Sequence, residues 1–347
     1  MTFPFALPLP SHPDPRDAPV LRWGVIGPGV IAIDFVAALL KHSNQQVVAV
    51  GSRSADRARA FAERFGIARA YGSYDELVAD AEVDAIYVAT PMSEHHANAL
   101  LAIGAGKPVL IEKSFTRTAA EARDIRDHAR AAGVLVMEAM KTRYQLQRQV
   151  IDRLLEDGVL GELDSVVAQF SAPIPYAADS RLFDPALGGG VLLDIGVYPL
   201  SFAASLLGEF SDVQATGTLA ASGVDDSFAA VLTTPSGSRA MVSASWRGTG
   251  PVRAEINGRQ ARIELGEPFQ NPTPLRLISA HGERRLEWDD RRYAGREGMV
   301  FQAAAFARYL HDELTDSPLL GLDESVRVME LLDELRHRIG ARFADER

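Results

Sequence analysis

Three residues have types and positions that suit acid–base chemistry. Asp194 and Tyr198 are four residues apart in a stretch predicted to be helical, so they share one face of that helix. Lys113 directly follows the apolar run 109–111, which predicts a buried strand. A phenol titrates near pH 10, but an ammonium group close by favours the phenolate and lowers that pKa. A lysine, an aspartate and a tyrosine brought together could therefore move a proton near neutral pH.

Each of these residues also has an ordinary structural explanation. Tyr198 could bond Asp194 as core support, since buried tyrosine hydroxyls usually find such partners. Lys113 could be a solvated loop residue, because lysine is normally exposed. The surrounding elements must decide between the two kinds of role.

The clearest of these elements is the stretch 21–32, LRWGVIGPGVIA, which predicts a strand, a sharp turn and a helix. Gly27 allows the tight turn, Gly29 allows close approach of phosphates, and Ala32 lets the helix pack against the strand. The pattern favours dinucleotide binding over an ordinary strand-to-helix turn. The residues expected to line the phosphates are Gly27, Pro28, Gly29, Val30 and Ile31.

The end of the next predicted strand, 47–51, indicates which dinucleotide binds. An Asp or Glu at this point would accept a hydrogen bond from a free ribose 2′-hydroxyl, whereas basic and hydroxyl residues accommodate a 2′-phosphate. Here the chain carries Ser52, Arg53 and Ser54, with Arg57 one turn further on. We therefore expect NADP, with NAD as the other choice if Arg53 is only a surface arginine.

Strands and helices alternate as far as residue 144, which is typical of a parallel sheet covered by helices. Ligands of such sheets lie beyond the carboxyl ends of the strands. The residues expected at that edge are Thr90, Pro91, His95, Glu112, Lys113 and Tyr144. His95 and His96 could equally cap a loop or face solvent.

After residue 146 the pattern changes to strands with alternating polarity and an Asn257-Gly258 turn, which indicates antiparallel hairpins. The strands are interrupted by residues 182–208, in which three glycines precede a helix of about four turns. Glycines 188–190 could serve a hinge or close packing. We expect an N-terminal arm over 1–20, which contains six prolines, a dinucleotide-binding domain over 21–145 and a second domain over 146–347. The last helix could pack back on the first domain.

Composition narrows the function further. The net charge of −10 argues against a nucleic-acid partner. The absence of cysteine excludes disulfides, thiolate metal sites and cysteine nucleophiles, and no His and carboxylate spacing indicates a metal site. We find no targeting signal and no apolar run long enough for a bilayer, so the cytoplasm is the expected compartment.

Six ordered motifs resemble the glucose-fructose oxidoreductase and inositol dehydrogenase family, most closely its branch of dimeric dihydrodiol dehydrogenases and NADP-linked xylose dehydrogenases. The motifs are GPGVIA, ATPMSEHH, IEKS, MEAMKTRY, GGGVLLDIGVYPL and LDESVRVMELLDELRHRIG, and the resemblance covers residues 20–340. It implies an α/β fold with an N-terminal Rossmann domain and a C-terminal α+β domain built on a large, mostly antiparallel sheet. It also implies a homo-oligomer, a dimer or a tetramer, that pairs through the open face of that sheet.

The resemblance assigns roles to residues at matching positions. The family's Glu-Lys-Pro motif falls on Glu112, Lys113 and Ser114, so Lys113 would contact the nicotinamide ribose and the substrate, while Ser114 replaces the usual proline. Asp194 and Tyr198 match the family's catalytic pair, and His95 matches a histidine common in the loop after the fourth strand. Substrate would also meet Lys141, where the branch usually has tryptophan, and Arg143. A lysine at position 141 makes the pocket more polar and aromatic dihydrodiols less favoured.

The expected reaction is reversible hydride transfer between NADP and a hydroxyl or carbonyl carbon of a sugar or cyclic polyol, with a D-xylose-like aldose favoured. Tyr198 would exchange the proton under the influence of Lys113, with Asp194 orienting the lysine or the substrate hydroxyls; Lys113 could instead transfer the proton itself. Other possibilities are reduction of a keto-sugar, including a nucleotide-linked one, and a sensor that binds NADP without turnover.

Overall fold

The computed structural model describes residues 3–10, 13–290, 292–343 and 346, and the chain divides into two compact units. The N-terminal unit consists of Pro13–Tyr144 and Gly295–Glu330. The C-terminal unit consists of Met1–His12, Gln145–Ala294 and Leu331–Arg347, within the described residues. Helix α9 (Leu322–Arg338) contributes residues to both.

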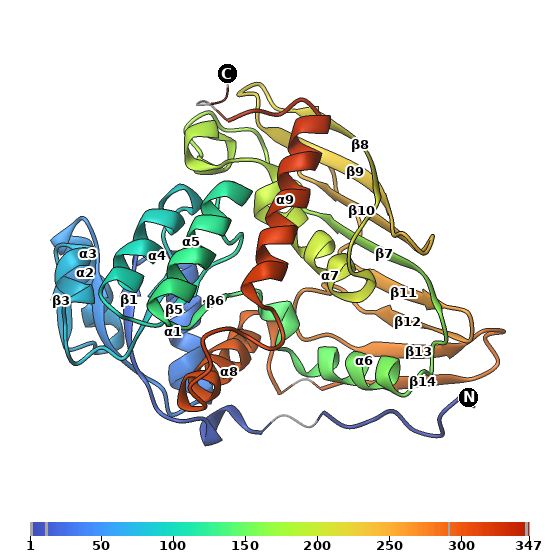
Figure 1. The fold of residues 1–347 in the computed structure, drawn as a ribbon, viewed down its shortest axis with the longest axis horizontal. Coiled ribbons are helices and arrows are strands. Elements are labelled where there is room, and N and C mark those ends of the chain that lie inside the picture. The colour runs from blue at the N-terminus through green and yellow to red at the C-terminus, as the bar shows by residue number, and fades with distance from the viewer. Residues whose placement is uncertain (1–2, 11–12, 291, 344–345, 347) are drawn as a thin grey trace. The chain divides into compact units, whose positions relative to one another are not determined.

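The N-terminal unit is built on a six-stranded sheet in the order β3-β2-β1-β4-β5-β6, and every neighbouring pair is parallel. Figure 1 labels β3, β1, β5 and β6 of this sheet and helices α1 to α5 of the same unit. The order reverses between β1 and β4, which is the switch point where doubly wound sheets bind ligands. The expected parallel sheet with helices is confirmed. Its strands are β1 (Arg22–Ile26), β2 (Gln46–Gly51), β3 (Arg69–Tyr71), β4 (Ala85–Val88), β5 (Val109–Ile111) and β6 (Val136–Glu138).

Local sequence signals set the ends of the helices in this unit. Ser54, Ser73 and Thr118 accept backbone N–H bonds at the starts of α2, α3 and α5. Gly66 and Gly133 end α2 and α5 in the left-handed conformation that glycine allows. The helices are α1 (Val30–His42), α2 (Ala55–Phe65), α3 (Tyr74–Val78), α4 (His95–Gly104), α5 (Ala119–Ala132) and α8 (Val300–His311).

Four aromatic rings form the centre of the core of the N-terminal unit. Phe35 of α1 stacks on Tyr87 of β4 with ring centroids 3.8 Å apart, and Trp23 of β1 meets Phe35 edge-on at 5.8 Å. On its other side Trp23 contacts Phe306 of α8 at 5.1 Å. Because α8 covers Trp23, residues 295–330 group with this unit, although the expected boundary at residue 145 assigns them to the second domain.

The C-terminal unit is built on an eight-stranded sheet in the order β14-β13-β12-β11-β7-β10-β9-β8, in which β7 and β10 are the parallel pair and all other neighbours are antiparallel. The expected large, mostly antiparallel sheet is confirmed. Its strands are β7 (Leu163–Ser171), β8 (Asp212–Leu219), β9 (Asp225–Thr233), β10 (Arg239–Ser245), β11 (Ala254–Gly258), β12 (Ala261–Leu265), β13 (Leu275–Ser279) and β14 (Arg285–Trp288). Helix α6 (Leu146–Glu156) leads into this unit.

Helix α7 (Val197–Leu207) packs against the middle strands of this sheet and is preceded by a π-helical segment, Leu192–Gly196. The stretch Pro185–Leu207 is 23 residues long, and its most apolar window of 18 residues has a mean hydropathy of 1.6, enough by length and composition to cross a membrane, which differs from the sequence expectation. The structure buries 67% of its most apolar window inside the protein, so here it serves as a core helix.

One buried acid at the end of the parallel sheet is held by a hydroxyl group. The Glu138 carboxylate, at the end of β6, accepts a hydrogen bond of 2.7 Å from Ser325 Oγ of α9. Burial raises the pKa of Glu138 from 4.5 to about 7, and the charge of Glu324 adds to the rise. The folded state therefore binds this proton more tightly than the unfolded chain does.

The raised pKa of Glu138 predicts how stability changes with pH. Its protonation supports the fold fully below pH 4.5, and this contribution is lost as the pH rises through about 7. In Glu138→Gln, which keeps an oxygen acceptor for Ser325 but cannot ionise, the free energy of unfolding should fall less between pH 4.5 and 7 than in the wild type. Denaturant unfolding at a series of pH values measures this difference, with exposed Glu63→Gln as the control. Parallel curves for wild type and Glu138→Gln would contradict it.

Candidate active site

The glycine turn after β1 is shaped by its contact with the loop after β4. Gly27 has φ +89°, and a Cβ added there would lie 2.8 Å from the Thr90 methyl group, so a side chain is excluded. A Cβ on Gly29 would meet only the Ala89 carbonyl oxygen, at 3.7 Å. Protein packing therefore does not require a glycine at position 29, whereas a ligand that approaches the backbone closely would.

Helix α1 begins directly after this turn and has no side-chain cap. Val30, its first residue, is exposed, while Ala32 is fully buried and allows the helix to lie close to the sheet. Backbone N–H groups in the first turn of a helix, together with the positive end of its dipole, bind phosphate groups. The predicted phosphate-binding residues thus form one uncapped helix start at the switch point of the sheet.

The end of β2 presents hydroxyl and guanidinium groups, as expected for a 2′-phosphate site. Ser52 Oγ accepts the Ser54 N–H at 3.2 Å, and Ser54 Oγ in turn caps α2 through the Arg57 N–H at 3.4 Å. The Arg53 side chain is 71% exposed, with Nη1 4.0 Å from Glu94 Oε1.

Sequence reasoning missed Tyr74, the first residue of α3, which belongs to this group of residues. Burial raises the pKa of Tyr74, and the positive charges of Arg53 and Arg57 act on the phenol in the opposite direction. The tyrosine follows a three-residue strand too short to be recognised, which is why no pattern marked it.

His95 connects the loops that follow β4 and β5. Its Nε2 lies 3.0 Å from the Thr90 carbonyl oxygen, and its Nδ1 lies 3.0 Å from that of Ser114 and 3.3 Å from that of Phe115. The ring is only 1% exposed, and burial lowers its pKa to about 4, so it is neutral at physiological pH. The two ring nitrogens thus lie against backbone oxygens of both loops, and the neutral ring can donate a hydrogen bond to one side only.

The loop after β5 carries Glu112 and Lys113. The buried Glu112 carboxylate accepts a hydrogen bond of 2.6 Å from the Tyr87 hydroxyl of β4 and one of 3.2 Å from the Lys113 backbone N–H. Burial raises the pKa of Glu112, while the nearby charges of Lys113 and Lys141 oppose that rise. Lys113 itself is half-buried, and the peptide bond to Ser114 is cis. Tyr87 was not singled out from sequence because it lies within an apolar strand, 25 residues from its partner.

Lys141 and Arg143 lie on a short 3-10 helix after β6 and are both buried. Burial lowers the pKa of Lys141 to about 8, and the charge of Arg296 adds to this effect while Glu112 opposes it. Arg296, which sequence reasoning missed, pairs with Asp34 of α1.

Arg143 is bonded within the N-terminal unit. Its guanidinium group pairs with the Glu324 carboxylate and donates to the Leu319 carbonyl oxygen. Arg143 therefore anchors the loop that leads into α9.

Asp194 and Tyr198 lie in the C-terminal unit, on the π-helical segment and on the first turn of α7 respectively. Between residues 191 and 200 they alone are half-exposed, while every other residue is buried. The Tyr198 ring lies beside Phe170 of β7, with centroids 5.8 Å apart. Both side chains thus reach the surface of an otherwise buried helix.

The structure explains the three glycines before this helix, whose role the sequence left open. Gly188 has φ +75°, and a Cβ on Gly189 would lie 2.5 Å from the Leu182 carbonyl oxygen. Gly190 has φ +130°, and its Cβ would overlap the Asp225 carboxylate. Close packing and positive φ angles therefore account for all three.

The predicted site residues thus form two groups, one in each unit. At the carboxyl edge of the parallel sheet lie the glycine turn, the serines and arginines after β2, and the loops with His95, Glu112, Lys113 and Lys141. On the helix of the C-terminal unit lie Asp194 and Tyr198. Among the described residues, no three His, Cys, Asp or Glu side chains converge in a way that could hold a metal ion.

Comparisons with known proteins agree with this architecture. Residues 21–140 match the model of the oxidoreductase family with an NAD-binding Rossmann fold, and residues 149–264 match the GFO/IDH/MocA C-terminal domain. The chain is similar to the trans-1,2-dihydrobenzene-1,2-diol dehydrogenase of Sus scrofa, with 34% identity covering 94% of this chain and 99% of the relative. It is also similar to the D-xylose 1-dehydrogenase (NADP(+)) of Hypocrea jecorina, with 33% identity covering 94% and 93%.

Among solved structures, the chain resembles KijD10, a 3-ketoreductase from Actinomadura kijaniata in complex with NADP and TDP-benzene. The TM-score is 0.80 with 29% identity, covering 92% of this chain and 98% of the ketoreductase. The parallel sheet with its glycine turn, the antiparallel sheet and the two family models lead to one conclusion. The chain belongs to the GFO/IDH/MocA family of oxidoreductases.

Proposed function

We propose that this oxidoreductase transfers a hydride between NADP and the hydroxyl or carbonyl carbon of a sugar or cyclic polyol, with a D-xylose-like aldose as the favoured substrate. The observation that carries the proposal is the half-buried Lys113, held by bonded loops at the same sheet edge as the uncapped glycine turn. The relatives act on a dihydrodiol and on D-xylose, which supports an alcohol carbon as the reacting centre.

The N-terminal unit fits NADP. The space beside Gly29 and the uncapped start of α1 would receive the pyrophosphate, with Thr90 and Pro91 flanking it. Arg53 and Arg57, with Ser52, would bind the 2′-phosphate, since guanidinium groups suit phosphate oxygens. When bound, the dinucleotide supplies the hydride acceptor or donor. The NADP named with the xylose dehydrogenase and the ketoreductase supports this choice.

The chain's own residues must move one proton for each hydride. When a hydroxyl group is oxidised, its proton passes to Tyr198 Oη, and it returns from there during reduction. Lys113 favours the phenolate through its charge, and Asp194 orients the lysine or the substrate hydroxyls. Direct proton transfer by Lys113 is the alternative, because lysine can also act as a general acid or base.

Lys141 and Arg143 complete the proposed substrate-binding set. Burial lowers the pKa of Lys141 to about 8, so it is mostly charged at neutral pH and favours a substrate rich in hydroxyl groups over an aromatic diol. We assign Arg143 a supporting role, since its guanidinium group is bonded to Glu324. We propose the cytoplasm as the compartment, because the single strongly apolar helix among the described residues is largely buried inside the protein.

A second candidate function is reduction of a keto-sugar carried on a nucleotide. The similarity to the 3-ketoreductase favours it, because that enzyme was solved with NADP and TDP-benzene. The same Lys113 and Tyr198 would serve this reaction in the reducing direction. Activity with free pentoses or hexoses separates the two candidates.

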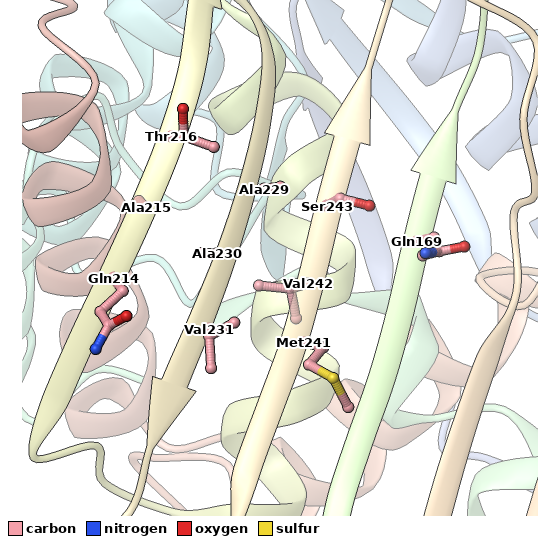
Figure 2. Close-up of a pocket in the computed structure, with 10 residues that line it drawn as sticks. All are labelled: Gln169, Gln214, Ala215, Thr216, Ala229, Ala230, Val231, Met241, Val242 and Ser243. Atoms are coloured by element: carbon pink, nitrogen blue, oxygen red, sulfur yellow. The ribbon is translucent and has the colours of Figure 1, made fainter.

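We further propose that the protein forms a homo-oligomer through the uncovered face of the eight-stranded sheet. Figure 2 shows this face of β7 to β10, with helices lying behind the strands. Val231 of β9 and Met241 of β10 pair across the strands and are 39% and 40% exposed. Polar side chains surround this apolar centre, which is typical of a surface that binds a second copy. The depression on this face is lined by Gln169, Gln214, Ala215, Thr216, Ala229, Ala230, Val231, Met241, Val242 and Ser243.

Turnover is the direct test of the proposed function. We expect purified protein to reduce NADP in the presence of a pyranose from a panel of pentoses, hexoses, inositols and dihydrodiols. Tyr198→Phe should keep its affinity for NADP while turnover falls by about 10²-fold or more, because the proton acceptor is gone. Absorbance of the reduced nicotinamide measures turnover, and titration of tryptophan fluorescence measures the affinity for NADP. Full activity of Tyr198→Phe would assign the proton to another group, and binding without turnover on the whole panel would favour a sensor.

Coenzyme choice tests the assignment of Arg53. We expect Arg53→Ala to weaken NADP binding by roughly tenfold, the effect of losing one charge-assisted hydrogen bond, and to leave NAD binding unchanged. Arg59→Ala is the matched control, because Arg59 is an exposed arginine on the following helix α2 and is paired with Asp56. Titration of tryptophan fluorescence gives the dissociation constants. An equal loss for NAD and NADP would contradict the assignment.

The assembly proposal predicts the effect of a charge on the open sheet face. Met241→Arg should shift the protein from an oligomer to a monomer, because it places an unpaired charge at the centre of the contact. Leu40→Arg, an exposed apolar position on α1, should leave the mass unchanged. Light scattering after gel filtration measures the mass. A Met241→Arg protein of wild-type mass, or a monomeric wild type, would refute this interface.

A further inference from the structure

Asp225, the first residue of β9, is a buried acid outside the proposed catalytic set. It is only 2% exposed. Its Oδ2 accepts a hydrogen bond of 2.6 Å from the backbone N–H of Leu192. Leu192 is the first residue of the π-helical segment that carries Asp194 and has no cap from its own chain neighbours. A carboxylate 33 positions away in sequence thus takes the place of a helix cap.

The same carboxylate rests against Gly190, two residues before the π-helical segment. Only glycine fits here, because φ is +130° and a Cβ would overlap Asp225 Oδ1. The Gly190 carbonyl oxygen in turn accepts the Asp194 backbone N–H at 3.2 Å. The Asp225 carboxylate is therefore linked to Asp194 through Gly190, which contacts both residues.

The other end of the π-helical segment is held by the same strand. A Cβ on Gly196 would lie 2.6 Å from Cε1 of Phe228, which places the Phe228 ring directly against the helix backbone. Phe228 is three residues after Asp225 in β9, and both are buried. Strand β9 therefore contacts the segment on either side of Asp194, by a hydrogen bond at one end and by an aromatic ring at the other.

A positive charge within the C-terminal unit favours the ionised form of Asp225. Burial raises its pKa to about 6, and the positive charge of Arg336 on α9 opposes that rise. Arg336 is itself buried and paired with Glu346 and Asp333. The carboxylate form thus predominates at neutral pH and can accept the hydrogen bond from the Leu192 N–H.

We propose that Asp225 is a positioning residue for the hydride-transfer reaction: it fixes the start of the π-helical segment and thereby the placement of Asp194 and Tyr198. The proposal rests on the function proposed above. An isosteric amide does not reproduce this carboxylate. If asparagine turned its one oxygen to the Leu192 N–H, its NH₂ group would lie against the Gly190 backbone, where Asp225 has Oδ1. Loss of this anchor would displace Asp194 and Tyr198 without touching the residues assigned to NADP.

The test compares Asp225→Asn with Asp226→Asn, whose carboxylate bonds the Thr218 hydroxyl instead. We expect kcat of Asp225→Asn to fall by at least about tenfold, since small displacements of reacting groups cost rate steeply. The dissociation constant for NADP should stay at its wild-type value, as should all kinetic constants of Asp226→Asn. If Asp225→Asn does not fold, Phe228→Leu, which withdraws the ring from Gly196, should give a smaller fall in kcat with unchanged NADP affinity.

A double-mutant cycle with Tyr198→Phe separates positioning from general weakening of the fold. If Asp225 acts through Tyr198 and Asp194, then Asp225→Asn should lower kcat by a clearly smaller factor in the Tyr198→Phe background than in the wild type, because one of the two groups that it positions is already gone. The proposal would be overturned if the fall in kcat of the double mutant equalled the product of the falls in the two single mutants. An unchanged kcat in Asp225→Asn would overturn it as well. An active wild type with multiplied losses refutes only the role of Asp225, whereas a wild type without any turnover refutes the proposed function and this inference with it.

Discussion

Ionisable side chains buried at the carboxyl edge of the parallel sheet must each be stabilised, and the arrangement of the active-site loops depends on this constraint. An unpaired charge in a protein interior is costly, so a buried acid or base needs a hydrogen bond or an opposite charge. Glu112 has the Tyr87 hydroxyl and the charges of Lys113 and Lys141. His95 has backbone oxygens on both sides of its ring. These bonds join the loops after β4 and β5, so the position of Lys113 follows from the burial of its neighbours.

The C-terminal unit meets a different demand, which is to expose two side chains from a buried helix. The π-helical segment widens one turn at Asp194, and such turns are frequent at functional sites. The first N–H groups of a helix have no partner within it, and the Asp225 carboxylate accepts the hydrogen bond of one of them, that of Leu192. Glycines at 190 and 196 allow β9 to approach the helix backbone at both ends of the segment. The proposed catalytic residues Asp194 and Tyr198 thus lie on a helical stretch that a neighbouring strand contacts at two points.

Sequence patterns predicted those features that depend on local order, and missed those that depend on distant partners. The alternating strands and helices and the glycine turn follow from residues close together in the chain. Strands β3, β13 and β14 were not predicted, because they have only three to five residues and β13 and β14 carry charged residues. Glu112 and Lys113 could be marked by their place after a strand. Tyr87 and Asp225 could not, since their partners are 25 and 33 residues away.

The path of the chain through the two units limits how the protein can be divided. A fragment that ended at Tyr144 would contain all six strands of the parallel sheet but would lack 295–330. That missing segment supplies Phe306, which covers Trp23, and Ser325, which bonds the Glu138 carboxylate. The dinucleotide-binding unit is therefore not a module that can be moved in one contiguous piece. Exchange of this unit between relatives, in evolution or by design, has to transfer two separate stretches of the gene together.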